Sequence, residues 1–561
     1  MRSIVKVGLV GVLCGVTMAA GAALAHFDTA PYKLAKKAVR VVVPRDAAAP
    51  KTAEDVPEVQ ADDLDQATFP SILPELKSEA VTIPATRSGT GGALTPAEDG
   101  VILLTHDGLM YHATGPDDVT GLKIELPENG FLDYQEDAVG RFSDLEHLLG
   151  NFRYNDILMI QRAGGRELYA SFTRYFQEDA CFVNAIARLS LPDGSVRDAS
   201  VPASDWETVF ETAPCLPLKP HRLALEGHMA GGRMAFDGDQ TIYMGSGDYH
   251  FDGSIHSPDL VISNDDSYEY GKVMALNIET LETLMLSRGN RNMQGLALLD
   301  GALYVVEHGA RGGDELNRIE EGGHYGWPYV SLGSDYNKQP QPGITTRGRH
   351  DGYEKPVFSW LPSVAISSLK PMSGVHEDWD GDLLMGSLKA RSLFRIRIEG
   401  DRVLFAEQIP VGQRVRYAQP LEGQLVLWTD DRKLMFITPD RFSEVDPVVK
   451  ALKAQGMSAE EAGRLAGNFV ACRECHSVSP DDSYSAPTLA NIFGAPIATG
   501  AYSEYSDALR AKGGVWDREA LTTFLTDPES FASGTSMPGP ELSPGAISET
   551  IMVLEALSAP N

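Results

Sequence analysis

Residues 291–317 read RNMQGLALLDGALYVVEHGARGGDELN, and this stretch indicates the fold of the largest part of the chain. Within it, the apolar run Ala302–Glu307 lies between an Asp-Gly pair and a Gly-rich segment. A short run that is rich in β-branched and aromatic residues and bounded by turn residues is typical of a β-strand. The stretch therefore predicts a short strand between turns.

Similar runs recur on both sides, from about Val101 to Pro439, separated by clusters of Gly, Asp, Asn and Pro. The clearest are Ile157–Ile160, Leu168–Phe172, Thr241–Met244, Lys272–Asn277, Asp382–Gly386, Leu393–Ile398, Leu425–Trp428 and Lys433–Thr438. Short strands at regular spacing predict an all-β repeat, either a propeller or a sandwich. About 340 residues are too many for one sandwich and suit a propeller of six or so four-stranded blades. We therefore expect an all-β propeller over residues 93–440.

After this region the apolar residues change to helical spacing. The segments concerned are Val445–Lys453, Ala459–Ala471, Ser503–Lys512, Arg518–Leu525 and Ser548–Leu557. We therefore expect a second, small all-α domain over residues 441–561.

The helical domain contains the C-x-x-C-H motif Cys472-Arg473-Glu474-Cys475-His476. Two thiols at this spacing can both reach the vinyl groups of a haem, and the adjacent His then ligates the iron. A zinc or exposed redox site is the alternative. Zinc would need a second ligand pair, however, and no Cys is left to supply it.

Cys181 and Cys215 are the pair outside this motif and outside the N-terminal segment that contains Cys14. An even pair in an oxidising compartment predicts a disulfide. Two buried free thiols are the alternative.

Residues 1–25 are typical of an export signal. Arg2 and Lys6 precede an uncharged stretch rich in Gly and Ala, which ends in the small-x-small pattern Ala23-Leu24-Ala25. The stretch is nearly long enough to span a bilayer, so an uncleaved N-terminal anchor is the alternative to a cleaved signal peptide. We expect a periplasmic protein, either soluble or anchored to the inner membrane by this segment.

Residues 26–92 have little hydrophobic periodicity and are rich in Ala, Pro, Asp, Glu and Thr, which predicts a tether or linker. The whole chain has 48 Lys and Arg against 78 Asp and Glu, a net charge of −30. So acidic a chain repels phosphate backbones, and we expect no nucleic-acid partner.

Residues 458–558 resemble a class I cytochrome c. The resemblance rests on Ser485–Leu489, Phe493-Gly494, Tyr505-Ser506, Trp516-Asp517, Leu521 and Gly534-Thr535-Ser536-Met537-Pro538. In the family the last of these segments delivers an axial Met, so the resemblance implies haem c with Met537 opposite His476. A thioether ligand raises the haem potential, which suits an electron acceptor.

The opening stretch, together with Tyr325-Gly326-Trp327-Pro328, is similar to the soluble PQQ-dependent aldose sugar dehydrogenases, a family of six-bladed β-propellers. The resemblance is good over about residues 220–440 and poor over 95–215. That family binds PQQ through an Arg-Asn pair, a Lys and an Arg-x-Arg, which correspond here to Arg291, Asn292, Lys389, Arg414 and Arg416. Arginines suit this cofactor because a guanidinium grips a carboxylate bidentately.

The resemblance also implies calcium. Backbone carbonyls that hold calcium at the cofactor correspond to Gly309 and Ala310, and a hard cation there polarises the quinone carbonyls. A second, structural calcium in some members corresponds to Glu315, Tyr325, Ser331 and Asp335.

The sequence departs from the family at the general base, a His four residues before an Arg, which removes the sugar hydroxyl proton. The position four before Arg233 is Met229, and the nearest His is His228. A shift of one residue turns a side chain to the other face of a strand, but a bulge at the extra Gly would restore it. His228 is therefore the candidate base, and a structural or solvated His is the alternative. A second departure is Tyr417, where the family usually has Asp.

Asp248, His250, Asp252 and His256 lie in a segment rich in Gly and Asp. Their spacing matches no standard ligand pattern, so we interpret the segment as an ordinary exposed loop, with a metal site as the alternative.

These features predict a periplasmic quinohaemoprotein dehydrogenase that oxidises an aldose or related alcohol at PQQ and passes electrons to its own haem c and on to a respiratory acceptor. A non-enzymatic alternative is a degenerate sugar- or partner-binding propeller that carries an electron-transfer cytochrome c. In a third alternative, the cytochrome serves an external dehydrogenase and the propeller only provides the surface to which that enzyme docks.

Overall fold

The computed structural model describes residues 65–71, 75–83, 91–137, 152–162, 164–218, 227–253, 260–336, 339–340, 348–440, 446–473, 475–479, 486–500 and 502–559. The predicted export segment, residues 26–64 of the predicted linker and His256 lie outside these residues. The chain divides into two compact units, which meet in the sequence at Thr438 and Pro439. No helix within the described ranges is long and apolar enough to cross a membrane.

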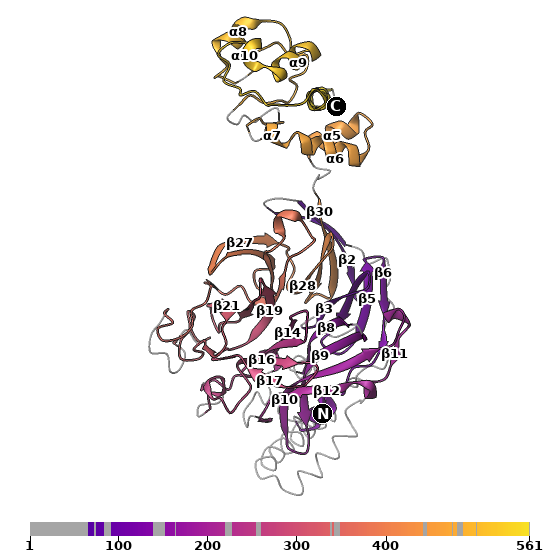
Figure 1. Cartoon of the computed structure of the whole chain (residues 1–561), viewed down its shortest axis with the longest axis vertical. Coiled ribbons are helices and arrows are strands. Elements are labelled where there is room, and N and C mark those ends of the chain that lie inside the picture. Colours follow the sequence, from indigo (N-terminus) through magenta and orange to yellow (C-terminus); the bar gives the residue numbers. More distant parts are fainter. Residues whose placement is uncertain are drawn as a thin grey trace, which may run out of the picture. The chain divides into compact units, whose positions relative to one another are not determined.

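The first unit is a six-bladed β-propeller, as predicted: its described strands form six sheets of four or five strands that follow one another along the chain. The innermost strands are neighbours around the centre (Figure 1). They are β3 (Ala93–Ala97), β8 (Tyr154–Arg162), β14 (Gly231–Phe236), β19 (Met293–Leu299), β24 (Ile366–Pro371) and β28 (Val415–Leu421). Because β28 lies beside β3, the first and last blades close the ring.

The remaining strands continue each blade outward. The second strands are β4 (Gly100–Leu104), β9 (Gly165–Phe176), β15 (Thr241–Ser246), β20 (Ala302–Glu307), β25 (Leu383–Ser387) and β29 (Gln424–Thr429). The third strands are β5 (Met110–Gly115), β10 (Cys181–Leu191), β16 (Lys272–Asn277), β21 (Asp314–Ile319), β26 (Ser392–Glu399) and β30 (Lys433–Asp440). The fourth strands are β6 (Asp118–Gly121), β12 (Glu207–Glu211), β17 (Thr283–Met285), β23 (Phe358–Trp360), β27 (Arg402–Pro410) and β2 (Glu75–Thr82).

Minor elements complete the propeller. Short strands are β1 (Asp65–Pro70) beside β2, β13 (Leu216–Pro217) beside β10, β7 (Lys123–Ile124) beside β11 (Ser200–Val201), and β18 (Ser287–Arg288) beside β22 (Gly323–His324). The helical turns are α3 (Phe131–Asp137), η4 (Val196–Asp198), η5 (Ala203–Asp205), η6 (Gly227–Met229), η7 (Ile262–Asn264) and η8 (Glu377–Trp379).

Burial explains the pattern of apolar residues along the strands of the blades. All five residues of β4 are buried, and so are those of β25, because neighbouring blades cover both faces of the inner strands. Such strands read as continuous apolar runs rather than as an alternation. The outer strand β27 instead mixes exposed and buried positions, because one of its faces is solvated.

The linker prediction is wrong for residues 65–70 and 75–82, since β1 and β2 are strands of the sheet that forms the last blade. Along β2, Leu76, Ser78 and Ala80 are buried and alternate with exposed Lys77 and Glu79. Two of the three buried residues are small, so the alternation carries a weak hydrophobic signal. A strand from the N-terminal side thereby adds to the blade that β28–β30 form.

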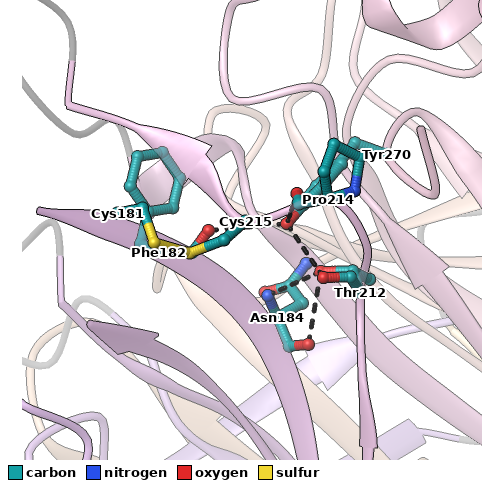
Figure 2. The surroundings of a disulfide bond; sticks show 7 residues. All are labelled: Cys181, Phe182, Asn184, Thr212, Pro214, Cys215 and Tyr270. Atoms are coloured by element: carbon teal, nitrogen blue, oxygen red, sulfur yellow. Dashed lines mark hydrogen bonds between the residues drawn. A yellow bond between two sulfur atoms is a disulfide. The ribbon is translucent and has the colours of Figure 1, made fainter. Parts of the chain in front are cut away.

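The predicted disulfide between Cys181 and Cys215 is confirmed, with the two Cα atoms 5.6 Å apart. It joins the start of β10 to the residue before β13 (Figure 2), next to the pairing of Phe182 with Leu216. On the same segment the Tyr270 hydroxyl donates a hydrogen bond to Pro214 O, at 3.0 Å. The disulfide therefore fixes the connection between two blades.

Replacing both Cys181 and Cys215 with Ser is expected to lower the free energy of unfolding of the propeller by about 3–4 kcal/mol, because the bond closes a loop over a sequence separation of 34. Urea unfolding of the wild type and the variant, each with and without reductant, measures this. Reductant should move the wild-type midpoint and leave that of the variant in place. Equal midpoints for the two oxidised proteins would contradict the expectation.

The second unit is the predicted small helical domain. Its described helices are α5 (Pro447–Ala454), α6 (Ala459–Asn468), α7 (Val470–Arg473), α8 (Asp507–Lys512), α9 (Arg518–Thr526), α10 (Pro528–Phe531) and α11 (Pro544–Leu557). They pack around one apolar core that includes Phe469, Trp516 and Leu554. Side-chain caps define the helix starts: Asp517 accepts a hydrogen bond from Ala520 N, and Ser543 accepts one from Ala546 N.

Candidate active site and haem-binding site

Five of the six innermost strands begin with the same irregularity. In β8, β14, β19, β24 and β28 the register with the next strand shifts so that one residue is left unpaired. The unpaired residues are Asn155, Gly232, Gln294, Ser367 and Arg416. A bulge re-aims its side chain, so five of the six blades each present one such residue at a common level near the centre of the propeller.

A cavity of about 270 Å³, including the solvent at its mouth, lies at this level. Three of the bulge residues line it, namely Asn155, Gln294 and Arg416. The other lining residues are Gly91, Gly92, Arg153, Tyr154, Gly227, His228, Gly231 and Arg233. The lining therefore combines the candidate base with arginines from three blades.

The bulge that the candidate base requires is present. The register of β14 shifts between Gly231 and Arg233, both Gly231 and Gly232 have positive φ, and His228 lies in the cavity wall. Met229, at the position where the sequence resemblance expects the base, is 2% exposed. The Asn292 amide donates a hydrogen bond to His228 O at 3.2 Å, which fixes the backbone there.

The predicted arginine pair shares one carboxylate. Arg414 Nε and Arg416 Nε both donate to the buried Asp430, at 2.9 and 2.8 Å. One carboxylate between two guanidinium groups leaves a positive charge, which Arg416 presents to the cavity. Lys389 is exposed, in the segment whose Leu388 O accepts a hydrogen bond from Arg414.

Arg291 and Asn292 lie beside this cavity rather than among its lining residues. The Arg291 guanidinium lies over the Trp327 ring, 5.0 Å from its centre, and its backbone N–H donates to the buried Glu307. Burial raises the pKa of Glu307 to about 7. Asn292 accepts a hydrogen bond from Gln294 Nε2 at 2.8 Å, which links the Arg-Asn pair to the cavity wall.

The segment with Asp248 and His250 is part of the site, so its interpretation as an exposed loop is wrong. Asp248 is fully buried and accepts a hydrogen bond from Trp327 Nε1, and burial raises its pKa to about 6. His250 Nε2 lies 3.2 Å from an Arg291 nitrogen, so the ring accepts from the guanidinium there. The contact with Arg291 engages one ring nitrogen of His250, and His256, the other His of the metal-site alternative, lies outside the described residues.

Tyr417 stands where the family usually has Asp, and a carboxylate from another blade lies beside it. Its hydroxyl donates to Asp156 at 3.0 Å, its ring lies under Arg233, and Asp156 lies 3.8 Å from the same guanidinium. The negative charge that the family usually has at position 417 is supplied here from β8.

The haem motif lies at the end of α7 and in the turn that follows. Cys472 is half-buried against the core of the helical unit, Cys475 is exposed, and both are free thiols. His476 Nδ1 lies 2.6 Å from Pro487 O; since a carbonyl only accepts, Nδ1 carries the proton and Nε2 is left for a metal. Met537 packs against the same core.

Residues 156–437 match the glucose/sorbosone dehydrogenase family. The chain belongs to this family. The chain is 30% identical to an uncharacterized protein of Synechocystis sp. over 247 residues, which is 40% of this chain. It is 29% identical to the aldose sugar dehydrogenase YliI of Escherichia coli over 260 residues, which is 44% of this chain. It spans 58% and 67% of the lengths of those two proteins.

The crystal structure of the soluble E. coli aldose sugar dehydrogenase in its apo-form has the same fold, with a TM-score of 0.51 at 23% identity, over 65% of this chain and 100% of that one. The C-terminal part is similar to a cytochrome c homologue of Rickettsia felis, 40% identical over 86 residues, which is 15% of this chain and 49% of that protein. The chain thus joins a glucose/sorbosone dehydrogenase propeller to a part that is similar to cytochrome c.

The described residues fit an anionic, oxygen-rich group such as PQQ. Arg153, Arg233 and Arg416 line the cavity, and beside it the buried Arg291 Nε has no hydrogen-bond partner among the described residues. The free thiols of Cys472 and Cys475, with the nitrogen of His476 and the thioether of Met537, have the chemistry that haem c requires.

The residues at the two calcium sites that the family implies do not by themselves fit calcium. Gly309 O accepts a hydrogen bond from Arg291 Nη1 at 3.3 Å, so a cation already faces this carbonyl. Calcium would need 6–8 oxygen ligands there. At the second predicted site, Glu315 faces His350 at 3.5 Å and the Tyr325 hydroxyl donates to Arg318 O. Asp335, with Ser331 in the same segment, bonds through its backbone N–H to Gln339 O.

Several site residues escaped the sequence interpretation. Arg153, Asn155 and Asp156 precede or begin an apolar run in the half of the chain that resembles the family least. Gln294 lies inside the stretch that indicated the fold, and Asp430 lies between the predicted strands Leu425–Trp428 and Lys433–Thr438. The bulge pattern, an unpaired residue near the start of five innermost strands, is what marks Asn155 and Gln294.

Proposed function

We propose that this protein is an exported dehydrogenase that oxidises an aldose or related alcohol in the propeller cavity and passes the electrons to haem c in its own C-terminal domain. One observation carries the proposal: His228 and Arg416, the candidate base and a candidate cofactor ligand, line the same cavity in a chain that also has a C-x-x-C-H motif.

Each residue has a role in this proposal. Arg416, Arg414 and Arg291 would hold the carboxylates of PQQ, with Asn292 and Lys389 as further polar contacts. When bound, PQQ supplies a two-electron acceptor for the hydride of the substrate. His228 would take the proton of the substrate hydroxyl, as a general base does. No role is assigned to a calcium ion.

In the second domain, Cys472 and Cys475 would attach the haem and His476 and Met537 would ligate its iron. Because donor and acceptor belong to one chain, electron transfer would not depend on collision between two proteins. A respiratory electron carrier would then receive the electrons.

The proposed location is the periplasm. The disulfide supports an oxidising compartment, and residues 1–25 have the pattern of an export signal. In the proposal this segment is either removed or anchors the protein to the inner membrane.

The test is reduction of the haem by a sugar. The purified full chain is reconstituted with PQQ, with and without calcium, and mixed with a panel of aldoses while the absorption of reduced haem is followed. Reduction that requires both PQQ and a sugar is the expected result. PQQ binding without reduction by any sugar or alcohol would favour a sugar- or partner-binding propeller, the second candidate, which the buried Met229 supports.

A further inference from the structure

His250 lies between the candidate base and a candidate cofactor ligand. Its Nε2 accepts a hydrogen bond from Arg291 Nη2 at 3.2 Å. Its ring stands almost perpendicular to the ring of His228, with the two ring centres 5.8 Å apart. Because a guanidinium only donates, the contact with Arg291 places the His250 ring proton on Nδ1 and leaves the ring neutral. One neutral imidazole therefore adjoins both functional side chains.

The backbone around His250 is fixed to both sides of the site. Gly247 N donates to Ala230 O at 2.7 Å, in the segment of the candidate base, and Asp248 N donates to Arg291 O at 2.9 Å. The buried Asp248 carboxylate also accepts a hydrogen bond from His250 N at 2.9 Å. The protein therefore sets the position of the imidazole before any ligand arrives.

This backbone has an unusual conformation. The φ angle is 58° at His250 and 48° at Tyr249, in the left-handed region that residues with a Cβ rarely adopt. Strained residues of this kind persist where the surrounding structure holds them, and they cluster at active sites. Glycine would adopt the same conformation without a steric cost. An imidazole at this position thus indicates that the side chain itself has a role.

We propose that His250 is a positioning residue that holds the Arg291 guanidinium and the His228 ring in place at the site. The inference rests on the proposed function and deepens it, because it adds a residue that acts through the candidate cofactor ligand and the candidate base. The hydrogen bond to Arg291 serves cofactor binding, and the ring contact with His228 serves removal of the substrate proton. Because the His250 ring is neutral, it adds no charge that would oppose protonation of His228.

The test compares the full-length wild type with His250→Gly, His250→Gln and the control Leu281→Gly. Glycine removes the imidazole and accommodates the left-handed backbone, whereas the amide oxygen of Gln can still accept from Arg291. Leu281 has a φ of 59° in the turn between β16 and β17 and is not among the lining residues of the cavity. Its change to Gly therefore alters the same kind of backbone away from the site.

Three measurements are made on each protein. Calorimetric titration with PQQ gives the Kd, and steady-state haem reduction at saturating PQQ gives kcat and the KM for the sugar. Thermal melting establishes that each variant is folded.

His250→Gly is expected to weaken PQQ binding about tenfold, because Arg291 loses an acceptor that fixes it. It should also lower kcat about tenfold, with little change in the KM for the sugar. His250→Gln should restore the PQQ affinity and leave kcat low, because it accepts from Arg291 and lacks the ring beside His228. Leu281→Gly should match the wild type in Kd, kcat and KM.

Wild-type Kd and kcat in a folded His250→Gly protein would overturn the inference, and a lower melting temperature alone would make His250 merely structural. A wild type that does not bind PQQ would overturn it as well. If His250→Gly weakens PQQ binding as expected but no sugar reduces the haem of the wild type, the proposed function fails and His250 still positions Arg291.

Discussion

His228→Ala is expected to lower the rate of sugar-dependent haem reduction by about 10²–10⁴-fold, the usual contribution of a general base. His228 lies in the cavity wall, and the bulge between Gly231 and Arg233 lies directly after it. The substitution removes the imidazole and leaves the cavity arginines in place. The affinity for PQQ should therefore change little, and the loss should appear in kcat.

The measurement is steady-state haem reduction at saturating sugar, with PQQ affinity measured separately on the same protein. His376→Ala is a matched control, because His376 caps η8 and contacts Trp379, and it is not among the lining residues of the cavity. A His228→Ala protein that binds PQQ and keeps a wild-type kcat would show that another group removes the proton. A variant that loses PQQ affinity and keeps kcat at saturation would make His228 a binding residue.

The strands of the blades were predictable where turn residues flank a buried apolar run. The predicted runs Ala302–Glu307 and Lys272–Asn277 have the bounds of β20 and β16. The outer strand β2 was missed because its buried positions include the small residues Ser78 and Ala80. An outer strand needs few large apolar side chains, so its local pattern resembles that of a linker.

The candidate site was predictable only where a motif marks it. The double glycine at Gly231-Gly232 indicated a bulge, and the bulge is present. The equivalent bulges at Asn155 and Arg416 have no glycine and gave no such signal. Their positions follow from pairing between strands, which a local pattern does not contain.

Non-local contacts also explain the error over Asp248. A stretch rich in Asp and Gly is usually solvated, and on its own it predicts a surface loop. Here Trp327 and Arg291 come from another blade and bury it, through the Trp327 hydrogen bond to Asp248 and the contact of Arg291 with His250. Both partners lie in or near the stretch that identified the fold, but nothing in their sequence says that they meet Asp248.

Replacing Cys472 and Cys475 with Ser is expected to abolish covalent haem attachment and, with it, all sugar-dependent haem reduction. Both thiols are free, and the thioether bonds of haem c have no other source in the described part of the helical domain. Sugar oxidation by the propeller should persist with a soluble dye as electron acceptor. Haem staining after denaturing electrophoresis and the dye-linked assay measure the two effects separately.

Arg473→Gln is the matched control, because it lies between the same two thiols and its ion pair with Asp446 contributes about 0–1 kcal/mol. It should retain covalent haem and haem reduction. If the double Ser variant also loses the dye-linked activity while it stays folded, the two domains depend on each other for catalysis. If it retains covalent haem, the assignment of the motif is wrong. Loss of the haem signal with dye-linked turnover intact would establish the order in which electrons move, from the propeller cavity to the haem and not the reverse.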